Sequence, residues 1–287
     1  MAARVGIVGL GNMGGAFAEN LIKHGFEVYG YDPLERCCAA LREAGGEVKP
    51  LEELAENCGV IILSLPSVRA LEEVLAVLVR AAAPGTIVAE ASTFPVEDKV
   101  RLKGTLEGSG ILLLDTPVSG NGAQASVGDL AVFLSGDEAA CHQIMPVLQG
   151  FSRSQTYLGA FGNGMKMKCA ANLMGAIHNV AAAEGLLLAT RSGLPAQLAY
   201  DVLTDSGANS RMLEVRGPMM VEGNFHGPGI TTQLFLKDLN LILDAVKANG
   251  LSSPAFEATL PLYQEAARSH PEEDTASVYA VLDAWDR

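Results

Sequence analysis

The stretch GNGMKMKCAANLMGAIHNVAAAEGLLLATRSG, residues 162–193, decides how the rest of the chain is organised. Between its terminal glycines it is dominated by Ala, Leu and Met, which are strong helix formers. A helix over residues 164–191 is about 40 Å long at a rise of ~1.5 Å per residue. Because few of its central residues are charged, we expect this helix to be buried nearly all round and to connect a first half of the chain to a second half.

Two polar side chains, Lys168 and Asn172, interrupt the apolar start of this helix. They are four residues apart, so they share a face. Gly164 lies one turn before Lys168, where we expect it to leave room for another molecule to approach. Burial and the positive end of a helix both lower the pKa of a lysine, which suits proton exchange near neutral pH. The alternative is a lysine that extends to solvent at a domain edge, and the spacing alone does not decide.

Composition excludes several classes of function. The 287 residues carry 20 basic and 33 acidic side chains, a net charge of −13, so we expect no nucleic-acid partner. No uninterrupted apolar run of about 18 residues was found, so we also expect no membrane span. The five cysteines match no metal-binding spacing, which predicts reduced thiols, no metal site and a cytoplasmic location.

A glycine-rich pattern lies near the start of the chain, at residues 9–14 (GLGNMG). An apolar strand-like run precedes it, a helix-compatible run follows, and residues 27–32 (EVYGYD) are typical of a second strand. In this context GxGxxG indicates a dinucleotide site. Gly9 makes the tight turn, Gly11 lets the backbone approach a pyrophosphate, and Gly14 permits close packing of helix on strand.

Asp32 ends the second strand. A carboxylate there accepts hydrogen bonds from the adenosine ribose and repels a 2′-phosphate, which predicts NAD, with NADP left open. The alternative is a structural glycine-rich turn in which Asp32 only caps a helix. The expected cofactor-binding residues of this region are Gly9, Leu10, Gly11, Asn12, Met13, Gly14 and Asp32.

Strands and helices continue to alternate up to residue 158, which predicts a doubly wound parallel sheet. The loops that follow the strands at 60–65 and 86–89 add Leu65, Pro66 and Thr93 as candidate cofactor contacts, because ligands bind at the carboxyl ends of such strands. The segment TPVSGNG, residues 116–122, has the backbone amides and hydroxyl of a carboxylate cradle. Alternatively, Leu65, Pro66 and Thr93 are only strand ends or helix caps, and the segment 116–122 is only a flexible loop.

Four motifs together resemble the β-hydroxyacid dehydrogenase family, the group that includes 3-hydroxyisobutyrate dehydrogenase, tartronate semialdehyde reductase, glyoxylate/succinic semialdehyde reductase and L-threonate dehydrogenase. They are GLGNMGGAFAENL at 9–21, DTPVSGNGAQASVGDL at 115–130, GNGMKMKCAANL at 162–173 and KDLNLILDA at 237–245. The resemblance implies a Rossmann-type α/β domain at 1–161 and an all-α domain for substrate binding and oligomerisation at 162–287, joined by the long helix at 164–191.

The resemblance also assigns site residues. It implies that Lys168 is the catalytic acid/base with Asn172 beside it, that Ser119 and Gly120 hold the substrate carboxylate, and that Thr93 and Lys237 lie near the nicotinamide. The chain departs from the family pattern at Asn121, where Ser-Gly-Gly is usual, and we expect Asn121 to contribute to the choice of substrate. The usual double Asn of the lysine motif is Ala-Asn here, which leaves Asn172 in place.

These observations predict an NAD-dependent oxidoreductase that interconverts a three- or four-carbon hydroxy acid and its semialdehyde or keto acid. We expect a homodimer or homotetramer, because the C-terminal helices are more apolar than a small bundle requires. The alternatives are an NADP-dependent glyoxylate/succinic semialdehyde-type reductase, an imine reductase and a catalytically silent dinucleotide-binding module. The last has no need of Lys168 and Asn172.

Overall fold

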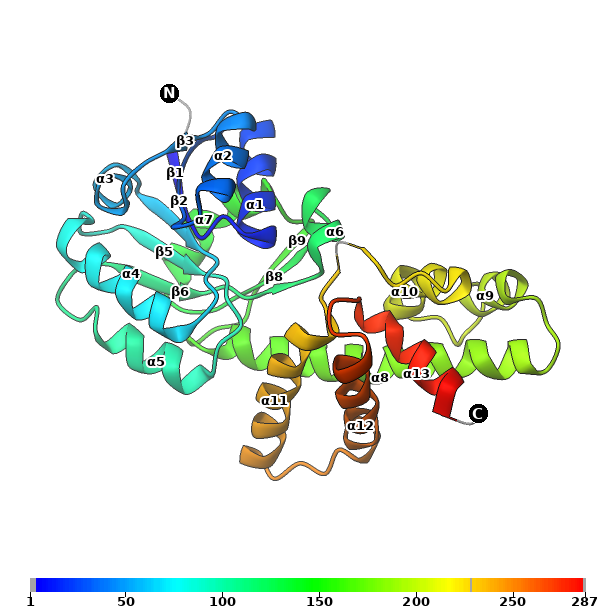
Figure 1. Ribbon diagram of the computed structural model, residues 1–287. Helices are drawn as coiled ribbons and strands as arrows, with labels where there is room; N and C mark the ends of the chain where they lie inside the picture. Colours follow the sequence, from blue (N-terminus) through cyan, green and yellow to red (C-terminus); the bar gives the residue numbers. More distant parts are fainter. Residues whose placement is uncertain (1–3, 228, 286–287) are drawn as a thin grey trace. The chain divides into compact units, whose positions relative to one another are not determined.

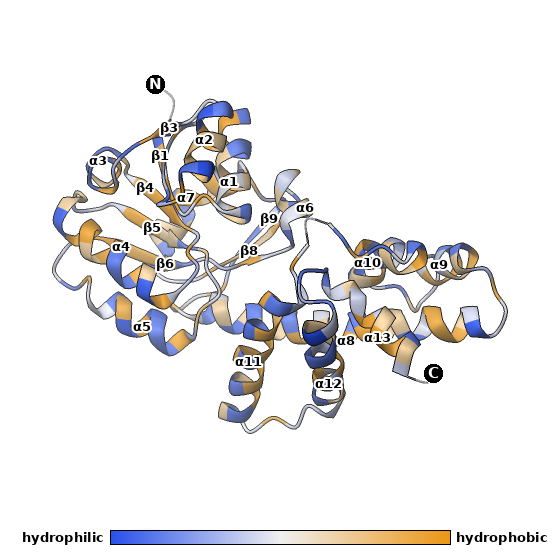
Figure 2. Cartoon of the chain, in the orientation of Figure 1, coloured by the Kyte–Doolittle hydropathy of each residue, from blue (hydrophilic) through white to orange (hydrophobic). Residues whose placement is uncertain are grey.

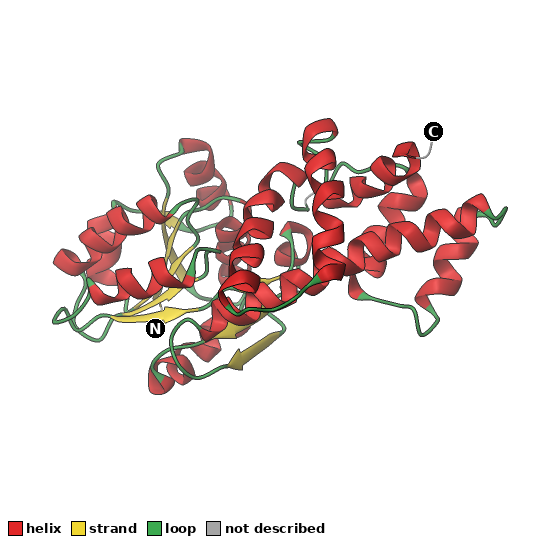
Figure 3. Cartoon of the chain, turned by 90° about the horizontal axis from the view of Figure 1, so that it is seen from below, coloured by secondary structure: helices red, strands yellow, loops and turns green. Residues whose placement is uncertain are grey.

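The computed structural model describes residues 4–227 and 229–285. The chain divides into two compact units, Met1–Lys168 and Cys169–Arg287, and the long helix α8 (Asn163–Arg191) contributes to both. Strands occur in the first unit, whereas the described part of the second is helical (Figures 1 and 3). The predicted fold class, an α/β Rossmann-type unit followed by a helical one, is confirmed.

The first unit is built on a six-stranded parallel sheet with the order β3-β2-β1-β4-β5-β6. This is the strand order of doubly wound dinucleotide-binding folds, with its crossover between β1 and β4. The strands are β1 (Arg4–Val8), β2 (Glu27–Tyr31), β3 (Glu47–Val48), β4 (Val60–Leu63), β5 (Ile87–Glu90) and β6 (Leu112–Asp115). Its inner strands β1, β4 and β5 are almost entirely buried, as expected of a parallel sheet covered on both faces.

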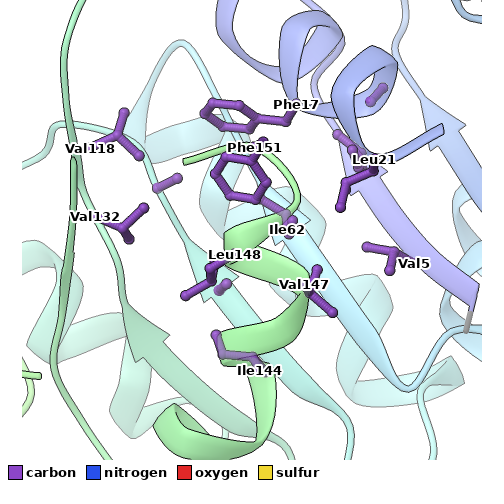
Figure 4. Packing of buried hydrophobic residues seen from close by; sticks show 14 of the residues in the cluster. Val5, Phe17, Leu21, Ile62, Val118, Val132, Ile144, Val147, Leu148 and Phe151 are labelled. Carbon is purple, nitrogen blue, oxygen red and sulfur yellow. The ribbon is translucent and has the colours of Figure 1, made fainter. Parts of the chain in front are cut away.

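Seven helices belong to the described part of the first unit besides the start of α8. They are α1 (Asn12–Lys23), α2 (Glu35–Glu43), α3 (Leu51–Asn57), α4 (Val68–Ala81), α5 (Val96–Gly104), α6 (Gly122–Ser126) and α7 (Glu138–Gln149). Alternate residues of a strand enter separate cores: Ile62 belongs to one buried cluster, and Ile61 and Leu63 belong to another. In the first cluster, Phe17 and Phe151 stack with ring centroids 4.4 Å apart (Figure 4).

A second sheet of three strands continues the first unit, with the order β7-β8-β9. Its strands are β7 (Val118–Ser119), β8 (Ala131–Leu134) and β9 (Ser154–Tyr157). The short elements β3, β7 and α6 were not predicted, and the segment that forms β7 and α6 was interpreted as one loop. Elements of two to five residues carry too little periodicity to be recognised.

The second unit contains most of α8 and a set of shorter helices around one buried cluster that includes Leu186, Phe256 and Tyr263. These helices are α9 (Ala196–Thr204), α10 (Arg211–Glu222), α11 (Thr232–Ala248), α12 (Pro254–Ser269), the short η1 (Thr275–Ser277) and α13 (Val278–Trp285). Several, such as α12, alternate polar and apolar residues, as Figure 2 shows. This amphipathic pattern buries one stripe of each helix.

Helix α8 has 29 residues and covers the predicted range, but it is not buried nearly all round. Met174 is 55% exposed and Leu188 is 73% exposed. The expectation of burial nearly all round is therefore wrong for a single chain, because the apolar composition of a helix does not show which of its faces other elements cover.

By length and composition, α8 also meets the criteria for a helix that could cross a membrane. Its qualifying window has a mean hydropathy of 1.3, and 39% of that window is buried in the chain. The sequence expectation concerned an uninterrupted apolar run, whereas His178 and Asn179 lie within every window of that length on α8. A single helix of this kind is weak evidence for a membrane span, because core helices of globular proteins meet the same criteria.

Candidate active site

The glycine-rich turn after β1 is closed by backbone contacts. Gly9 has a φ of 88° and donates its N–H to the carbonyl oxygen of Tyr31 at 2.9 Å. A side chain at Gly9 would overlap the carbonyl oxygen of Ser64, and one at Gly14 would overlap the carbonyl oxygen of Gly9. These two positions therefore require glycine for the turn and for the approach of α1 to β1.

Gly11 differs from its neighbours because the space at its Cβ position is open. Apart from Gly11 and its two chain neighbours, no atom of the described residues lies within 4 Å of that position, and Gly11 is exposed. Gly11 is the residue before α1, and it has no side chain with which to cap the amides of the first turn. An open Cβ position beside uncapped helix amides fits the pyrophosphate of a dinucleotide.

Asp32 holds the end of β2 to the glycine-rich turn. One carboxylate oxygen accepts the N–H of Leu10 at 2.8 Å, and the other accepts the N–H of Leu34 at 2.8 Å. Asp32 thus also has the structural role that was the alternative to cofactor binding, because it holds Leu34 at the start of α2. Each carboxylate oxygen has a second lone pair, so these contacts leave acceptor capacity for ribose hydroxyls.

The loops after β4 and β5 are tied together at the same edge of the sheet. The N–H of Leu65 donates to Ser92 Oγ at 2.8 Å, and the N–H of Ser92 donates to a carboxylate oxygen of Glu90 at 2.9 Å. Thr93 follows directly and is half-buried, whereas Pro66 is exposed. The structure therefore brings Leu65, Pro66 and Thr93 to the edge that carries the glycine-rich turn, and Ser92 is the link that the sequence did not indicate.

Ser119 ends β7, and Asn121 begins α6 as its N-cap. The side chain of Asn121 accepts the N–H of Gln124 at 3.0 Å, and Gln124 Oε1 accepts the N–H of Asn121 at 3.2 Å, which forms a capping box. Gly120 between them has a φ of 138°, and a Cβ there would overlap a side-chain carbon of Leu130. This segment thus forms a short strand and a capped helical turn, which the sequence did not indicate.

Lys168 lies in the second turn of α8 and is 8% exposed, whereas Lys166 is exposed and donates to Asn163 Oδ1 at 3.1 Å. Lys168 therefore does not extend to solvent, whereas Lys166 does. The expectation for Gly164 is wrong. A Cβ at Gly164 would lie 2.5 Å from the carbonyl oxygen of Phe133, so the missing side chain lets α8 contact the sheet and leaves no room for a ligand.

Asn172 and Lys237 belong to the second unit. Asn172 is half-buried and donates through Nδ2 to Asp238 Oδ2 on α11 at 3.0 Å. Lys237, the preceding residue of α11, is exposed. The side chain of Asn172 is thus oriented by Asp238, which lies in the KDLNLILDA motif at 237–245 but was given no role in the site by the sequence.

A buried charge network in the first unit was missed altogether. Lys99 Nζ lies 2.6 Å from Glu90 Oε2 and 2.8 Å from Asp115 Oδ1, and all three side chains are at most 1% exposed. Burial alone would lower the pKa of Lys99, but the negative charges of Glu90 and Asp115 outweigh burial and raise this pKa. The signal in the sequence is that two apolar strands, β5 and β6, each end in an acid.

Two family profiles match consecutive parts of the chain. The NAD-binding domain of 6-phosphogluconate dehydrogenase matches residues 4–159. The profile described as NAD-binding of NADP-dependent 3-hydroxyisobutyrate dehydrogenase matches residues 162–282. The first covers the sheet that carries the glycine-rich turn, and the second begins at the glycine before α8.

Relatives match over almost the full length. A Mycobacterium tuberculosis protein named "probable 3-hydroxyisobutyrate dehydrogenase" is 32% identical over 98% of each chain. The L-threonate dehydrogenase of Escherichia coli is 31% identical over 97% of this chain and 94% of its own. Among solved structures, the 3-hydroxyisobutyrate dehydrogenase of M. tuberculosis with L-serine superposes with a TM-score of 0.87 and 31% identity, over 99% of this chain and 100% of that one. The chain belongs to the β-hydroxyacid dehydrogenase family and is an NAD(P)-binding oxidoreductase that acts on a CH–OH group.

Proposed function

We propose that this enzyme uses Lys168 as the general acid/base in the interconversion of a three- or four-carbon hydroxy acid and its semialdehyde or keto acid. The observation that carries the proposal is the burial of Lys168 on α8, one turn before Asn172, whose amide is oriented by Asp238. A buried amine beside a fixed amide donor is suited to proton transfer at a substrate oxygen. The proposed domains are 1–161 for the dinucleotide and 162–287 for substrate binding and oligomerisation.

The proposed chemistry divides between the cofactor and the chain. NAD(P), when bound, takes up or supplies the hydride. In oxidation the neutral amine of Lys168 accepts the proton of the substrate hydroxyl as the carbonyl bond forms. In reduction the ammonium returns that proton to the carbonyl oxygen. Asn172 orients this oxygen by a hydrogen bond.

We propose that Ser119, Gly120 and Asn121 hold the substrate carboxylate. Gly120 supports this role through its unusual backbone, which turns the chain between β7 and the start of α6. The acceptor oxygen of Asn121 already caps α6, so only its Nδ2 group is a candidate donor to substrate. The names of the relatives and the L-serine of the solved structure support a small hydroxy acid.

A turnover panel tests the proposed function. Purified protein is assayed with NAD and with NADP against 3-hydroxyisobutyrate, threonate, L-serine and glycerate, and against their semialdehyde or keto forms. Oxidation of at least one of these acids above the rate without substrate supports the proposal. Cofactor binding without turnover of any of them would favour the silent dinucleotide-binding module.

We propose NAD as the preferred cofactor, because the Asp32 carboxylate would repel a 2′-phosphate. Arg36 on α2 is exposed and is the nearby cation that could accept that phosphate instead. We expect the Kd of NADP to exceed that of NAD by at least about tenfold, or ~1.4 kcal/mol.

Titration of wild-type protein and two variants checks this prediction. Asp32→Asn removes the charge and should reduce the difference between the two Kd values. Glu35→Gln removes a charge three residues away, in an exposed ion pair with Arg42 at 2.7 Å, and should leave the difference unchanged. Tighter binding of NADP by the wild type would contradict the assignment.

We propose a cytoplasmic homodimer or homotetramer. Leu188 at the end of α8 and Leu194, Leu198 and Val202 in the following loop and α9 are at least 50% exposed, which is unusual for so many neighbouring apolar side chains. Light scattering should give at least twice the chain mass of 30.0 kDa at micromolar concentration.

Charge substitution locates the proposed interface. The double variant Leu188→Lys, Leu198→Lys should shift the mass toward that of one chain. Val100→Lys, on α5 and 51% exposed, is the matched control and should not change the mass. A wild-type protein that scatters as a single chain would rule out the oligomer.

A further inference from the structure

The start of α8 is held by side chains from two distant strand ends. Gly162, the residue before α8, has no side chain with which to cap the first-turn amides. Asp115 Oδ2, at the end of β6, accepts the N–H of Met165 at 2.8 Å, and Ser135 Oγ accepts the N–H of Gly164 at 2.9 Å. These acceptors occupy the position of an N-cap side chain but come from residues 29 and 50 positions away.

The other oxygen of Asp115 faces away from α8. Asp115 Oδ1 accepts from Lys99 Nζ at 2.8 Å, and Lys99 is also paired with Glu90, the register partner of Asp115 in the neighbouring strand. Ser135 Oγ donates to Asp115 Oδ2 at 3.1 Å. Asp115 therefore has a partner on every side and a fixed orientation, and the two carboxylates with one ammonium leave a negative charge beside the positive end of α8.

The backbone of α8 packs closely against the strand ends at Gly164. The Cβ position of Gly164 is 2.5 Å from the carbonyl oxygen of Phe133 and 2.9 Å from Asp115 Oδ2, so the helix backbone lies directly on the strand ends. Lys168 follows Met165 by three residues, or about 4.5 Å along the helix axis. A shift or tilt of the first turn is thus transmitted to the amine of Lys168.

We propose that Asp115, oriented by Lys99 and Ser135, is a positioning residue for catalysis, because it sets the first turn of α8 and through it the reacting amine of Lys168. The inference rests on the proposed role of Lys168. Misplacement of a catalytic group by about 1 Å lowers turnover by as much as ~10²-fold. Asp115→Asn keeps the size of the side chain but turns one of its two acceptor oxygens into an NH₂ donor. This donor then faces another donor, either Lys99 Nζ or the N–H of Met165, so one hydrogen bond is lost.

A double-mutant cycle distinguishes positioning from a purely structural role. The kcat of hydroxy-acid oxidation is measured at saturating cofactor and substrate for the wild type, Asp115→Asn, Lys168→Ala and the double variant. We expect Asp115→Asn to lower kcat by about 10- to 100-fold when Lys168 is present, with the Kd of NAD within about twofold of the wild type. In the Lys168→Ala background, the same substitution should change the residual kcat by less than about twofold.

Two further variants keep the test decisive. Gly164→Ala moves the same helix start by steric contact and takes the place of Asp115→Asn in the cycle if circular dichroism shows the latter to be unfolded. Gly185→Ala, on the same helix with its nearest contact at 4.0 Å, is its control and should leave kcat unchanged. Asp274→Asn breaks another buried ion pair, with Arg216 at 2.9 Å, and its effect should be equal in both backgrounds.

Three outcomes would overturn the proposal. An unchanged kcat for Asp115→Asn would show that the position of the helix start does not matter. An equal loss with and without Lys168 would make Asp115 a structural residue and leave the assignment of Lys168 standing. Full activity of Lys168→Ala would remove both the acid/base assignment and the positioning role that depends on it.

Discussion

Replacing Lys168 with alanine should lower turnover by about 10²- to 10⁴-fold, the usual loss for a general acid/base. Lys168 is buried in the second turn of α8, and alanine at this position removes the amine that is proposed to transfer the proton. The affinity for NAD should stay within about twofold, because the glycine-rich turn and Asp32 are unchanged. Steady-state kinetics and a direct cofactor titration measure the two quantities separately.

Lys166 provides the control within the same helix. Two residues from Lys168, it points about 160° away around the axis, and its ammonium donates a hydrogen bond to Asn163 on the same turn. Lys166→Ala removes one exposed hydrogen bond and should change kcat by less than about twofold. Equal losses for the two variants, or a larger loss for Lys166→Ala, would place the chemistry on the other face of α8.

Two further measurements connect the loss to proton transfer. The rate of hydroxy-acid oxidation by the wild type should rise with pH, because the amine must be neutral to accept a proton. Lys168→Ala should lose this dependence, and an added primary amine such as methylamine should restore part of its activity. Restoration of Lys166→Ala by the same amine is not expected.

The fold follows from the sequence where the local pattern is strong. The strand–GxGxxG–helix–strand order before Asp32 and the apolar runs of β4 and β5 predict a doubly wound sheet, because periodicity and turn chemistry agree there. The strand β7 and helix α6 have no such pattern. They are held by the capping box of Asn121 and Gln124 and by the packing of Leu130 against Gly120, which depend on the folded turn.

Only part of the candidate site can be predicted from the local sequence pattern. Lys168 and Asn172 are found from helical spacing, but the partners that orient the site come from distant segments. Asp115 reaches α8 across 50 residues, and Asp238 reaches Asn172 across 66. Gly164 is an example. The sequence shows that this position has no side chain, but only the folded structure shows that the carbonyl oxygen of Phe133 occupies the space beside it.

The glycine-rich turn should separate binding from folding in two single substitutions. At Gly14 a methyl group overlaps the carbonyl oxygen of Gly9, so Gly14→Ala must displace α1 from β1. Overpacking of this kind costs about 1–3 kcal/mol, which corresponds to a Tm lower by roughly 2–10 °C for a domain of this size. Because the turn itself moves, NAD affinity should fall as well.

Gly11→Ala should weaken NAD binding without a comparable loss of stability. Its Cβ position is open and its φ is −67°, which alanine adopts without strain, so the Tm should stay within about 2 °C of the wild type. A methyl group there stands where a pyrophosphate approaches the amides of α1, so the Kd of NAD should rise by at least about tenfold. Gly104→Ala, also with open space at its Cβ position, is the control for a glycine far from the turn and should leave the Kd of NAD unchanged. Thermal unfolding and cofactor titration of the three variants decide the matter: an unchanged Kd for Gly11→Ala would mean that the open space at this turn is not where the dinucleotide phosphates bind.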